Sequence, residues 1–346
     1  MPHHLSALIV VRGTDPLPAP RSIGTLAAEV EPGGGPAPGP PTIYRGGMET
    51  GIEIVRAFVA ESGLSAATIP EQREAMAQMA SSAAPPEGVT IEPVSLGGRP
   101  AEWLTPEGGS EGAVLYLHGG GYCIGSLDTH RHLGARIAQA TGSTVVVVDY
   151  RLAPEHQFPA ALDDAVAAYL DLLALGADPA HLAIAGDSAG GGLTVATLLA
   201  LRTLEVPLPA AAACLSPWAD LTQSAPAFQR LAELDPMVSK SGLDLMAEAY
   251  LGDTDPRTEL ASPLFAESLS GLPPVLIEVG QHEVLIDDST HLAERLGAAG
   301  VKVTLTVWPD MIHVFQAFPG DLIPEADASI NAVGAFLAGH LGAGQP

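Results

Sequence analysis

LAIAGDSAGGGLTVATLLALR, residues 182–202, is the stretch that decides the fold of this chain. Its first four residues are apolar and too few for a helix, so they predict a buried strand, and residues 193–201 predict a helix. The turn between them must be sharp, and a tight turn needs small residues on both sides of its apex. A strand, the pattern Gly186-x-Ser188-x-Gly190 and a helix predict a nucleophile elbow with an exposed Ser188 hydroxyl. The amides that begin the helix would favour negative charge at the same place.

This pattern is a weak signal by itself, because the chain contains 38 glycines. The alternative is a glycine-rich helix start in which Ser188 is an ordinary first-turn residue. The strand before the motif and the helix after it favour the elbow, because the motif carries its chemistry only in that setting.

Composition limits the class of protein and its partners. The 346 residues are 47% hydrophobic, enough for one large α/β domain with a smaller appendage or for two domains. The 40 acidic and 15 basic residues give a formal net charge of -25, which repels nucleic acid and anionic membranes. A salty habitat and a codon bias both fit this excess of acid.

Cysteine usage and the N-terminal residues indicate the compartment. Cys123 and Cys214 are too few for a disulfide framework. Residues 5–11 are apolar, but no basic residue precedes them, which is unlike a signal peptide. No stretch is long enough to span a bilayer. We therefore expect a cytoplasmic protein that binds neither nucleic acid nor membranes.

From residue 89 onward the sequence alternates apolar strands with helices, which predicts a mostly parallel sheet covered by helices on both faces. Residues 89–96 and 101–105 predict a hairpin that turns at Gly97-Gly98. Further predicted strands are 113–117, 144–148, 182–185, 210–215, 275–279 and 301–308. Predicted helices are 130–140, 158–175, 193–201, 289–299 and 326–340.

Other segments fall outside this alternation. Residues 1–41 end in a run rich in proline and glycine that cannot hold a regular element, which predicts a flexible extension. Residues 48–60 and 70–80 look helical, and a proline opens the second. Residues 217–272 separate two strands by more than a crossover needs and contain one helical stretch, 241–251. Insertions of this size form lids or substrate walls.

A nucleophilic serine needs donors for the oxyanion that its attack creates. The run from His118 through three glycines to Tyr122 directly follows a predicted strand, so its backbone amides can face an oxyanion at the carboxyl end of the sheet. The amide of Ala189 would complete the hole. A flexible glycine turn is the alternative. We expect His118 to brace this loop through hydrogen bonds.

The serine also needs a base. His313 follows the last predicted strand, where the base of such a site belongs, and His282 competes with it after the preceding strand. The spacing of His130 and His132 would suit zinc, but no third ligand is placed near them. We therefore expect no metal site.

The acid that orients the base should follow the strand before the base's strand. Three carboxylates lie there. Glu283 is nearest the strand end, whereas Asp287 and Asp288 immediately precede a predicted helix. Asp288 could cap that helix.

Taken together, the motifs resemble those of the bacterial hormone-sensitive-lipase-like esterases, a family with the α/β-hydrolase fold. The resemblance covers about residue 70 to the C-terminus. It rests on His118-Gly-Gly-Gly-Tyr122, Asp149-Tyr-Arg-Leu-Ala-Pro-Glu155, Gly186-Asp-Ser-Ala-Gly-Gly191 and Asp310-Met-Ile-His313. It implies that Ser188 is the nucleophile, that His313 is the base, and that the amides of Gly119, Gly120 and Ala189 form the oxyanion hole.

The resemblance also bears on the acid. Many members of the family place it at the first Asp of an Asp-x-x-x-Asp run. Here the first position is Glu283 and the second is Asp287. Glu283 lies 30 residues before His313, similar to the family's usual spacing. We therefore expect Glu283, with Asp287 as the alternative.

The family resemblance implies a domain organisation. Residues 86–216 and 259–346 are expected to form the α/β-hydrolase catalytic domain. Residues 42–85 and 217–258 are expected to form a helical cap, which matches the segments that break the alternation. The resemblance says nothing about residues 1–41. A homodimer is common among relatives, and residues 301–307 offer a sheet edge for it.

The implied activity is that of a carboxylesterase that hydrolyses short- to medium-chain acyl esters of small molecules through an acyl-enzyme, with no cofactor and no metal. Tyr122 and Trp218 would line the acyl pocket, although a Trp after a strand is equally often a core residue. The same residues could cleave a lactone, carbamate or amide. A non-catalytic ligand-binding protein is the alternative from another class.

Overall fold

The computed structural model describes residues 8–11, 50–62, 68–80, 87–109 and 112–342. The strands in these residues are β1 (Leu8–Val11), β2 (Val89–Leu96), β3 (Arg99–Pro106), β4 (Ala113–Leu117), β5 (Thr144–Val148), β6 (Leu182–Asp187), β7 (Ala211–Leu215), β8 (Val275–Gly280) and β9 (Val303–Trp308). They form one sheet in the order β1-β9-β8-β7-β6-β4-β5-β3-β2. β3 is antiparallel to both of its neighbours, and all other pairs are parallel.

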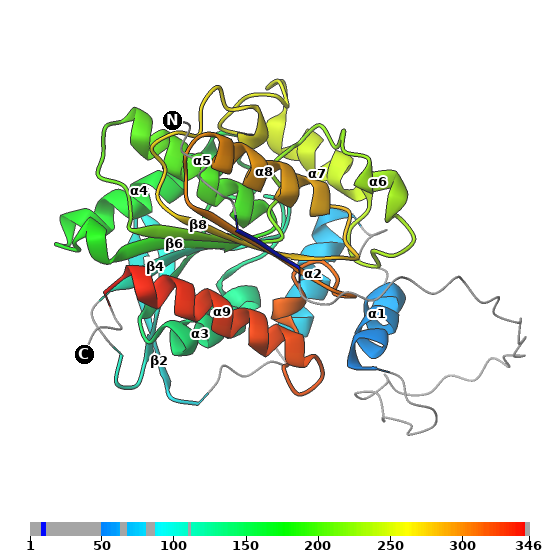
Figure 1. The fold of residues 1–346 in the computed structure, drawn as a ribbon, viewed down its shortest axis with the longest axis horizontal. Helices are drawn as coiled ribbons and strands as arrows, with labels where there is room; N and C mark the ends of the chain where they lie inside the picture. Colours follow the sequence, from blue (N-terminus) through cyan, green and yellow to red (C-terminus); the bar gives the residue numbers. More distant parts are fainter. Residues whose placement is uncertain (1–7, 12–49, 63–67, 81–86, 110–111, 343–346) are drawn as a thin grey trace, which may run out of the picture.

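Helices cover both faces of this sheet, as the alternation predicts (Figure 1). On one face lie α4 (Ala160–Ala174), α5 (Ala189–Thr203) and α8 (Ile286–Ala298), and on the other lie α3 (Leu127–Thr141) and α9 (Pro324–His340). Strand β5 shows why an unbroken apolar run suits this layer. Val146 and Val148 join the core beneath α4 and α5, whereas Val145 and Val147 join the core against α3 and α9.

Sequence signals at both ends of α3 fix its boundaries. The Ser126 hydroxyl accepts the Thr129 amide, and the Thr129 hydroxyl accepts the Ser126 amide, which together form a capping box. Gly142 ends the helix in the left-handed region, with φ 64°. The sequence pattern placed the start of this helix three residues too late, because the capping residues lie before the apolar run.

The segments outside the alternation gather toward one end of the sheet, at the right of Figure 1. They contain α1 (Gly51–Ser62), α2 (Ile69–Ala80), α6 (Ala227–Arg230) and α7 (Lys240–Leu251). The Arg56 guanidinium of α1 donates to the Leu234 carbonyl between α6 and α7. These contacts tie the first helical segment to the insertion that we expected at residues 217–258.

Strand β1 corrects the expectation for residues 1–41. Residues Leu8–Val11 pair in parallel with residues 304–307 of β9, so this part of the expected flexible extension is a strand. The rest of residues 1–41 lies outside the described residues. The same pairing occupies residues 304–307 of the edge that was suggested for a dimer, so β1 is the outermost strand at that edge of the sheet.

Helix α8 begins earlier than predicted. It starts at Ile286 rather than Ser289, so Asp287 and Asp288 lie in its first turn, and the N-cap position belongs to Leu285. The cap role suggested for Asp288 is therefore wrong. The Asp288 carboxylate instead accepts the amides of Ala219 and Asp220, at 2.9 Å each.

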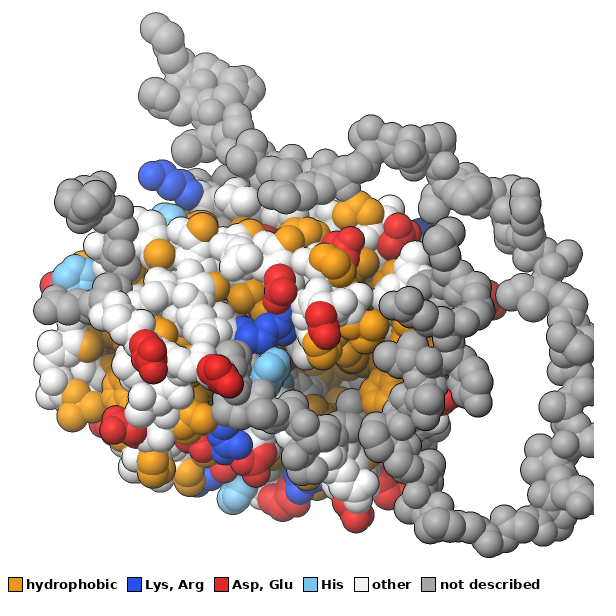
Figure 2. All heavy atoms as spheres, turned by 90° about the horizontal axis from the view of Figure 1, so that it is seen from below, with side chains coloured by type: hydrophobic (Ala, Val, Ile, Leu, Met, Phe, Trp, Pro, Cys, Tyr) orange, Lys and Arg blue, Asp and Glu red, His pale blue; other side chains and the backbone are white. Residues whose placement is uncertain are grey.

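On the face that Figure 2 shows, the acidic side chains do not gather into one patch. Red side chains are spread there among hydrophobic ones and a few Arg and Lys side chains. Within the described residues, no helix is both long and apolar enough to cross a membrane.

Candidate active site

Ser188 lies at a strained turn between β6 and α5. Its φ of 52° and ψ of -120° are unfavourable for a residue with a Cβ, and its neighbours hold it there. The Ser188 amide donates to the Leu215 carbonyl at 2.8 Å, and the Ser188 carbonyl accepts the Trp218 amide at 2.9 Å. The predicted elbow is therefore present, anchored by the end of β7. Ser188 is only 8% exposed, so its hydroxyl is not exposed as the motif predicted.

The glycines around Ser188 are required by the packing of the turn. A Cβ on Gly190 would lie 1.9 Å from the Leu117 carbonyl oxygen. A Cβ on Gly186 would lie 2.3 Å from the Gly190 carbonyl oxygen. Because backbone atoms cannot yield to a side chain, only glycine fits at either position.

Ser188, His313 and Glu283 form one chain of hydrogen bonds, although 125 residues separate the first two. His313 Nε2 lies 2.9 Å from Ser188 Oγ, and His313 Nδ1 lies 2.5 Å from Glu283 Oε2. A carboxylate can only accept, so Nδ1 carries the proton and Nε2 is left to accept from the serine hydroxyl. Burial opposes the charged imidazolium, but the hydrogen bond and charge of Glu283 outweigh it and raise the pKa of His313.

Glu283 is held rigidly and is fully buried. Its second oxygen, Oε1, accepts the Gly280 amide at 2.6 Å and the Ser216 hydroxyl at 2.9 Å. The Ser216 hydroxyl in turn accepts the Val314 amide at 3.2 Å, so it joins the acid to the loop that carries the base. Sequence reasoning did not single out Ser216. Its position directly after β7, at the same sheet edge as Ser188, was the available signal.

The alternative acids do not contact His313 through hydrogen bonds. Asp287 accepts the Ala227 amide at 2.8 Å and pairs with Arg230 at 2.8 Å. Asp288 is buried among backbone amides, and burial raises the pKa of its carboxyl to about 8. Of the three carboxylates, the structure brings only Glu283 to the base.

The competing histidine is occupied elsewhere. His282 Nδ1 lies 2.6 Å from Arg56 Nη2, and because a guanidinium can only donate, Nδ1 is the acceptor. Burial and then the Arg56 charge lower the pKa of His282. The same Arg56 nitrogen donates to the Asp310 carbonyl at 2.8 Å. His282 therefore belongs to a contact between α1 and the neighbouring loops.

The glycine loop departs from the expected oxyanion hole at one position. The Gly119 amide donates to Asp187 Oδ1 at 3.1 Å, so it already has a partner, and a Cβ on this glycine would lie 2.1 Å from Asp187 Oδ2. The amides of Gly120, Gly121 and Ala189 have no hydrogen-bond partner within the described part of the chain. Gly121 takes a φ of 58°, and a Cβ there would lie 2.0 Å from the sulfur of Met246 in α7.

A buried polar cluster braces the glycine loop from behind. His118 Nδ1 is 2.7 Å from the Gly119 carbonyl, and its ring stacks on Tyr150 at 4.1 Å. Burial lowers the pKa of His118 to about 3, so the ring is neutral and Nδ1–H donates. His118 thus has the bracing geometry expected for it. His130 Nε2 lies 3.5 Å from Asp187 Oδ2, on the elbow side of the cluster.

The aromatic residues proposed for the acyl pocket lie in the core. Tyr122 is 1% exposed and Trp218 is fully buried. The Tyr122 ring stacks on Tyr250 with centroids 3.9 Å apart, and Trp218 Nε1 donates to the Asp220 carbonyl at 3.1 Å. In this structure both side chains are therefore packed in the core. For Trp218 this is the core role that the sequence analysis gave as the alternative.

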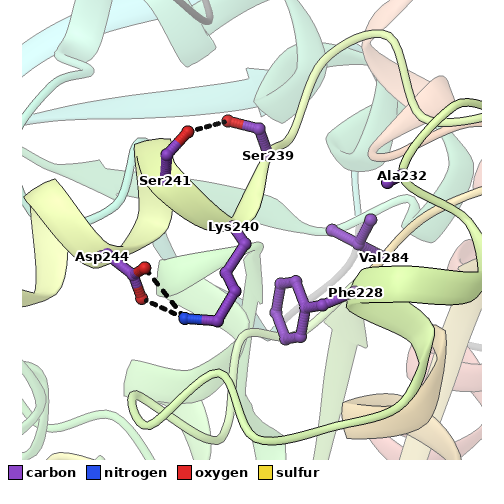
Figure 3. A pocket seen from close by; sticks show the side chains of 7 residues that line it. All are labelled: Phe228, Ala232, Ser239, Lys240, Ser241, Asp244 and Val284. Atoms are coloured by element: carbon purple, nitrogen blue, oxygen red, sulfur yellow. Dashed lines mark hydrogen bonds and ion pairs between the residues drawn. The ribbon is translucent and has the colours of Figure 1, made fainter.

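A cavity of about 350 Å³ borders the acid loop (Figure 3). Its apolar side includes Phe228 and Val284, and Val284 directly follows Glu283. On the polar side the Lys240 ammonium pairs with Asp244 at 2.9 Å, as Figure 3 shows. Figure 3 places the cavity between the segments that carry α6 and α7.

Comparisons with known proteins show the family to which the chain belongs. Residues 114–317, more than half of the chain, match the family model described as the alpha/beta hydrolase fold. An acetyl-hydrolase of Streptomyces hygroscopicus is 45% identical over 251 residues, which is 72% of this chain and 83% of that protein. A putative acetyl-hydrolase, LipR, of Mycobacterium tuberculosis is 37% identical over 80% of this chain and 90% of its own length.

Solved structures give the same assignment. The crystal structure of an esterase from the bacterial hormone-sensitive lipase family has a TM-score of 0.81 and 44% identity, and the match covers 84% of this chain and 98% of that one. An esterase/lipase from an uncultured bacterium has a TM-score of 0.80 and 42% identity over 85% of this chain and all of its own. The chain therefore belongs to the bacterial hormone-sensitive-lipase-like esterases of the α/β-hydrolase superfamily, and it is a carboxylic-ester hydrolase.

Proposed function

We propose that this chain hydrolyses short- to medium-chain acyl esters of small molecules, with Ser188 as nucleophile, His313 as general base and Glu283 as the acid. The observation that carries this proposal is the hydrogen-bonded chain from Ser188 Oγ through His313 to Glu283 Oε2. A serine hydroxyl is a poor nucleophile at neutral pH unless a base contacts it and a third group orients that base.

The first half of the reaction forms an acyl-enzyme. Ser188 Oγ bonds to the acyl carbon while its proton moves to His313 Nε2, and the carbonyl oxygen becomes an oxyanion. Glu283 stabilises the imidazolium through the Nδ1 proton. The tetrahedral intermediate then collapses, the ester C–O bond breaks, and Nε2–H gives its proton to the departing alkoxide.

Water completes the cycle. His313 takes a proton from the water molecule, whose oxygen bonds to the acyl carbon, and the Ser188 ester bond breaks. The proton returns to Ser188 Oγ, and the carboxylic acid leaves.

The oxyanion is proposed to rest on the amides of Gly120, Gly121 and Ala189. The Ala189 amide is the first of α5 and is aligned with the helix dipole. Gly120 and Gly121 replace the expected pair of Gly119 and Gly120, because Asp187 already occupies the Gly119 amide. Loss of one donor of this kind typically costs about 2.7–4 kcal/mol of transition-state stabilisation.

The substrate range is proposed from the enclosure of the site and from the relatives. All three side chains of the triad are buried, with Ser188 the most exposed of them. One similar protein is named an acetyl-hydrolase and another a putative acetyl-hydrolase. We further propose that residues 42–85 and 217–258 act as a cap over the site, since Met246 of α7 packs on the glycine loop.

A chain-length series tests this proposal. Initial rates on p-nitrophenyl esters from acetate to palmitate should give the highest kcat/KM among the short and medium chains, and a Ser188→Ala variant should lose turnover. Labelling by an organophosphate should add one adduct at Ser188. Turnover by Ser188→Ala comparable to that of the unaltered enzyme would refute the mechanism, and a maximum at palmitate would refute the substrate range.

A further inference from the structure

Asp235 is a buried carboxylate that the reaction above does not use. It lies between α6 and α7 in the insertion, and it is 7% exposed. Oδ1 accepts the amides of Met237 and Val238, at 3.0 and 2.9 Å, and these bonds stay within the loop. Oδ2 reaches across 49 residues of sequence to accept the Val284 amide at 2.9 Å.

The contact with Val284 places Asp235 against the acid of the triad. Val284 directly follows Glu283, so the Asp235 carboxylate holds the backbone that presents the Glu283 side chain. The Gly280 amide and the Ser216 hydroxyl both donate to the Glu283 carboxylate itself. The acid loop is thus clamped between the central sheet and the insertion.

The charge of Asp235 also acts on the base. Three carboxylates act electrostatically on His313: Glu283 from the loop after β8, Asp235 from the insertion and Asp187 from the elbow. Asp235 itself is acted on by His313, Glu283 and the Arg56 guanidinium of α1. Burial raises the pKa of the Asp235 carboxyl above its ordinary value, and the charge of His313 together with the amide donors of Val238 and Val284 offsets part of that rise.

Resting on the proposed triad, we propose that Asp235 is a positioning residue for the ester hydrolysis. It holds Glu283 in place through the Val284 amide and supplies a second negative charge that stabilises the His313 imidazolium. The insertion then has a part in assembling the catalytic residues, in addition to covering them.

The test compares Asp235→Asn with the unaltered enzyme. Asparagine preserves the shape but removes the charge, and its amide cannot accept from Val284 and from the loop amides on separate oxygens. The kcat for p-nitrophenyl acetate should fall about tenfold, the effect of losing one charge-assisted hydrogen bond, while KM changes little. The acid limb of kcat/KM against pH should move to lower pH, because less negative charge faces His313.

Two further variants keep the result interpretable. Asp235→Glu retains the charge, so its acid limb should stay at the pH of the unaltered enzyme even where its kcat falls. This variant also gives a reading if Asp235→Asn does not fold. Asp255→Asn removes an exposed carboxylate of the same insertion that accepts the Arg257 amide, and its kcat and pH profile should match those of the unaltered enzyme.

The possible results distinguish a failure of the role proposed for Asp235 from a failure of the proposed triad. Unchanged kcat and an unchanged acid limb in Asp235→Asn would overturn the inference. An acid limb that moves equally in Asp235→Glu would also overturn it, because charge would not be the cause. Loss of turnover in Ser188→Ala, measured in the same assay, would support Ser188 as the nucleophile whatever the result for Asp235.

Discussion

Replacing Glu283 by glutamine changes one atom of the site and tests how His313 is oriented. In the structure Oε1 of Glu283 accepts the Gly280 amide at 2.6 Å, and Oε2 accepts the proton on His313 Nδ1. A glutamine has one acceptor oxygen and one NH₂ donor at these two positions. The backbone amide of Gly280 can only donate, so it requires the oxygen. The NH₂ group must then face His313.

The consequence is the wrong tautomer of His313. An NH₂ group facing Nδ1 requires Nδ1 to be the acceptor, so the proton moves to Nε2, the nitrogen beside Ser188. His313 can then no longer accept the serine proton. An acid-to-amide change in a serine protease triad lowers kcat about 10⁴-fold by this route, equivalent to about 5 kcal/mol of barrier, and we expect a loss of that size.

The assay is the hydrolysis of p-nitrophenyl acetate at pH 8, with kcat and KM determined separately and the fold checked by circular dichroism. Asp287→Asn is the matched control, because its carboxylate contacts only Ala227 and Arg230 among its recorded partners. This control should keep kcat within about twofold, because the ion pair that it removes has a half-exposed arginine and does not contact His313. The reasoning would be refuted if a folded Glu283→Gln enzyme kept more than a tenth of the original kcat, or if Asp287→Asn were the variant that lost activity.

Three other outcomes follow from single contacts. Gly121→Ala should lower kcat at least about tenfold by displacing the oxyanion loop, because the new Cβ would lie 2.0 Å from the Met246 sulfur. Adding Met246→Ala should restore part of the rate, and no recovery in the double variant would contradict this account. The pKa of Asp288 is about 8 in the folded protein against an ordinary value of 3.8, so the folded state holds an extra proton between these values and loses stability as pH rises through that window. Asp288→Asn should remove this dependence, so its Tm relative to the unaltered protein should increase from pH 5 to pH 8, and a constant difference would rule it out. Burial raises the pKa of both Cys123 and Cys214 to about 12, so mass spectrometry should find no alkylation by iodoacetamide at pH 8 until the protein is unfolded.

The local sequence pattern was sufficient to predict the architecture and the functional residues at the ends of the strands. Apolar runs of five or six residues alternating with helical periods specify a parallel sheet, because such strands must be buried on both faces. The carboxyl ends of parallel strands meet at one edge, so Ser188 after β6 and His313 after β9 were expected at the same place. Glu283 was expected from its family position. These assignments depend on sequence order and side-chain type, which the sequence contains directly.

The sequence pattern could not predict contacts between segments that are distant in the chain. Leu8–Val11 is too short to be recognised as a strand until the free edge of β9 provides its hydrogen bonds. The partner of the Gly119 amide is Asp187, 68 residues away, and nothing in either segment indicates that pairing. The start of α8 was misplaced because Asp287 and Asp288 look like capping residues, yet their carboxylates bind backbone amides of the insertion instead.

The sequence by itself determined the order of strands and helices, the elbow and the candidates for the three catalytic side chains, because each depends on residues close together in the chain. Only the tertiary structure decided which carboxylate reaches His313, which amides remain free for an oxyanion, and that Asp235 supports the acid loop. Those outcomes require groups from segments that are distant in sequence to come within hydrogen-bond distance of one another, and this is set by how the whole core packs.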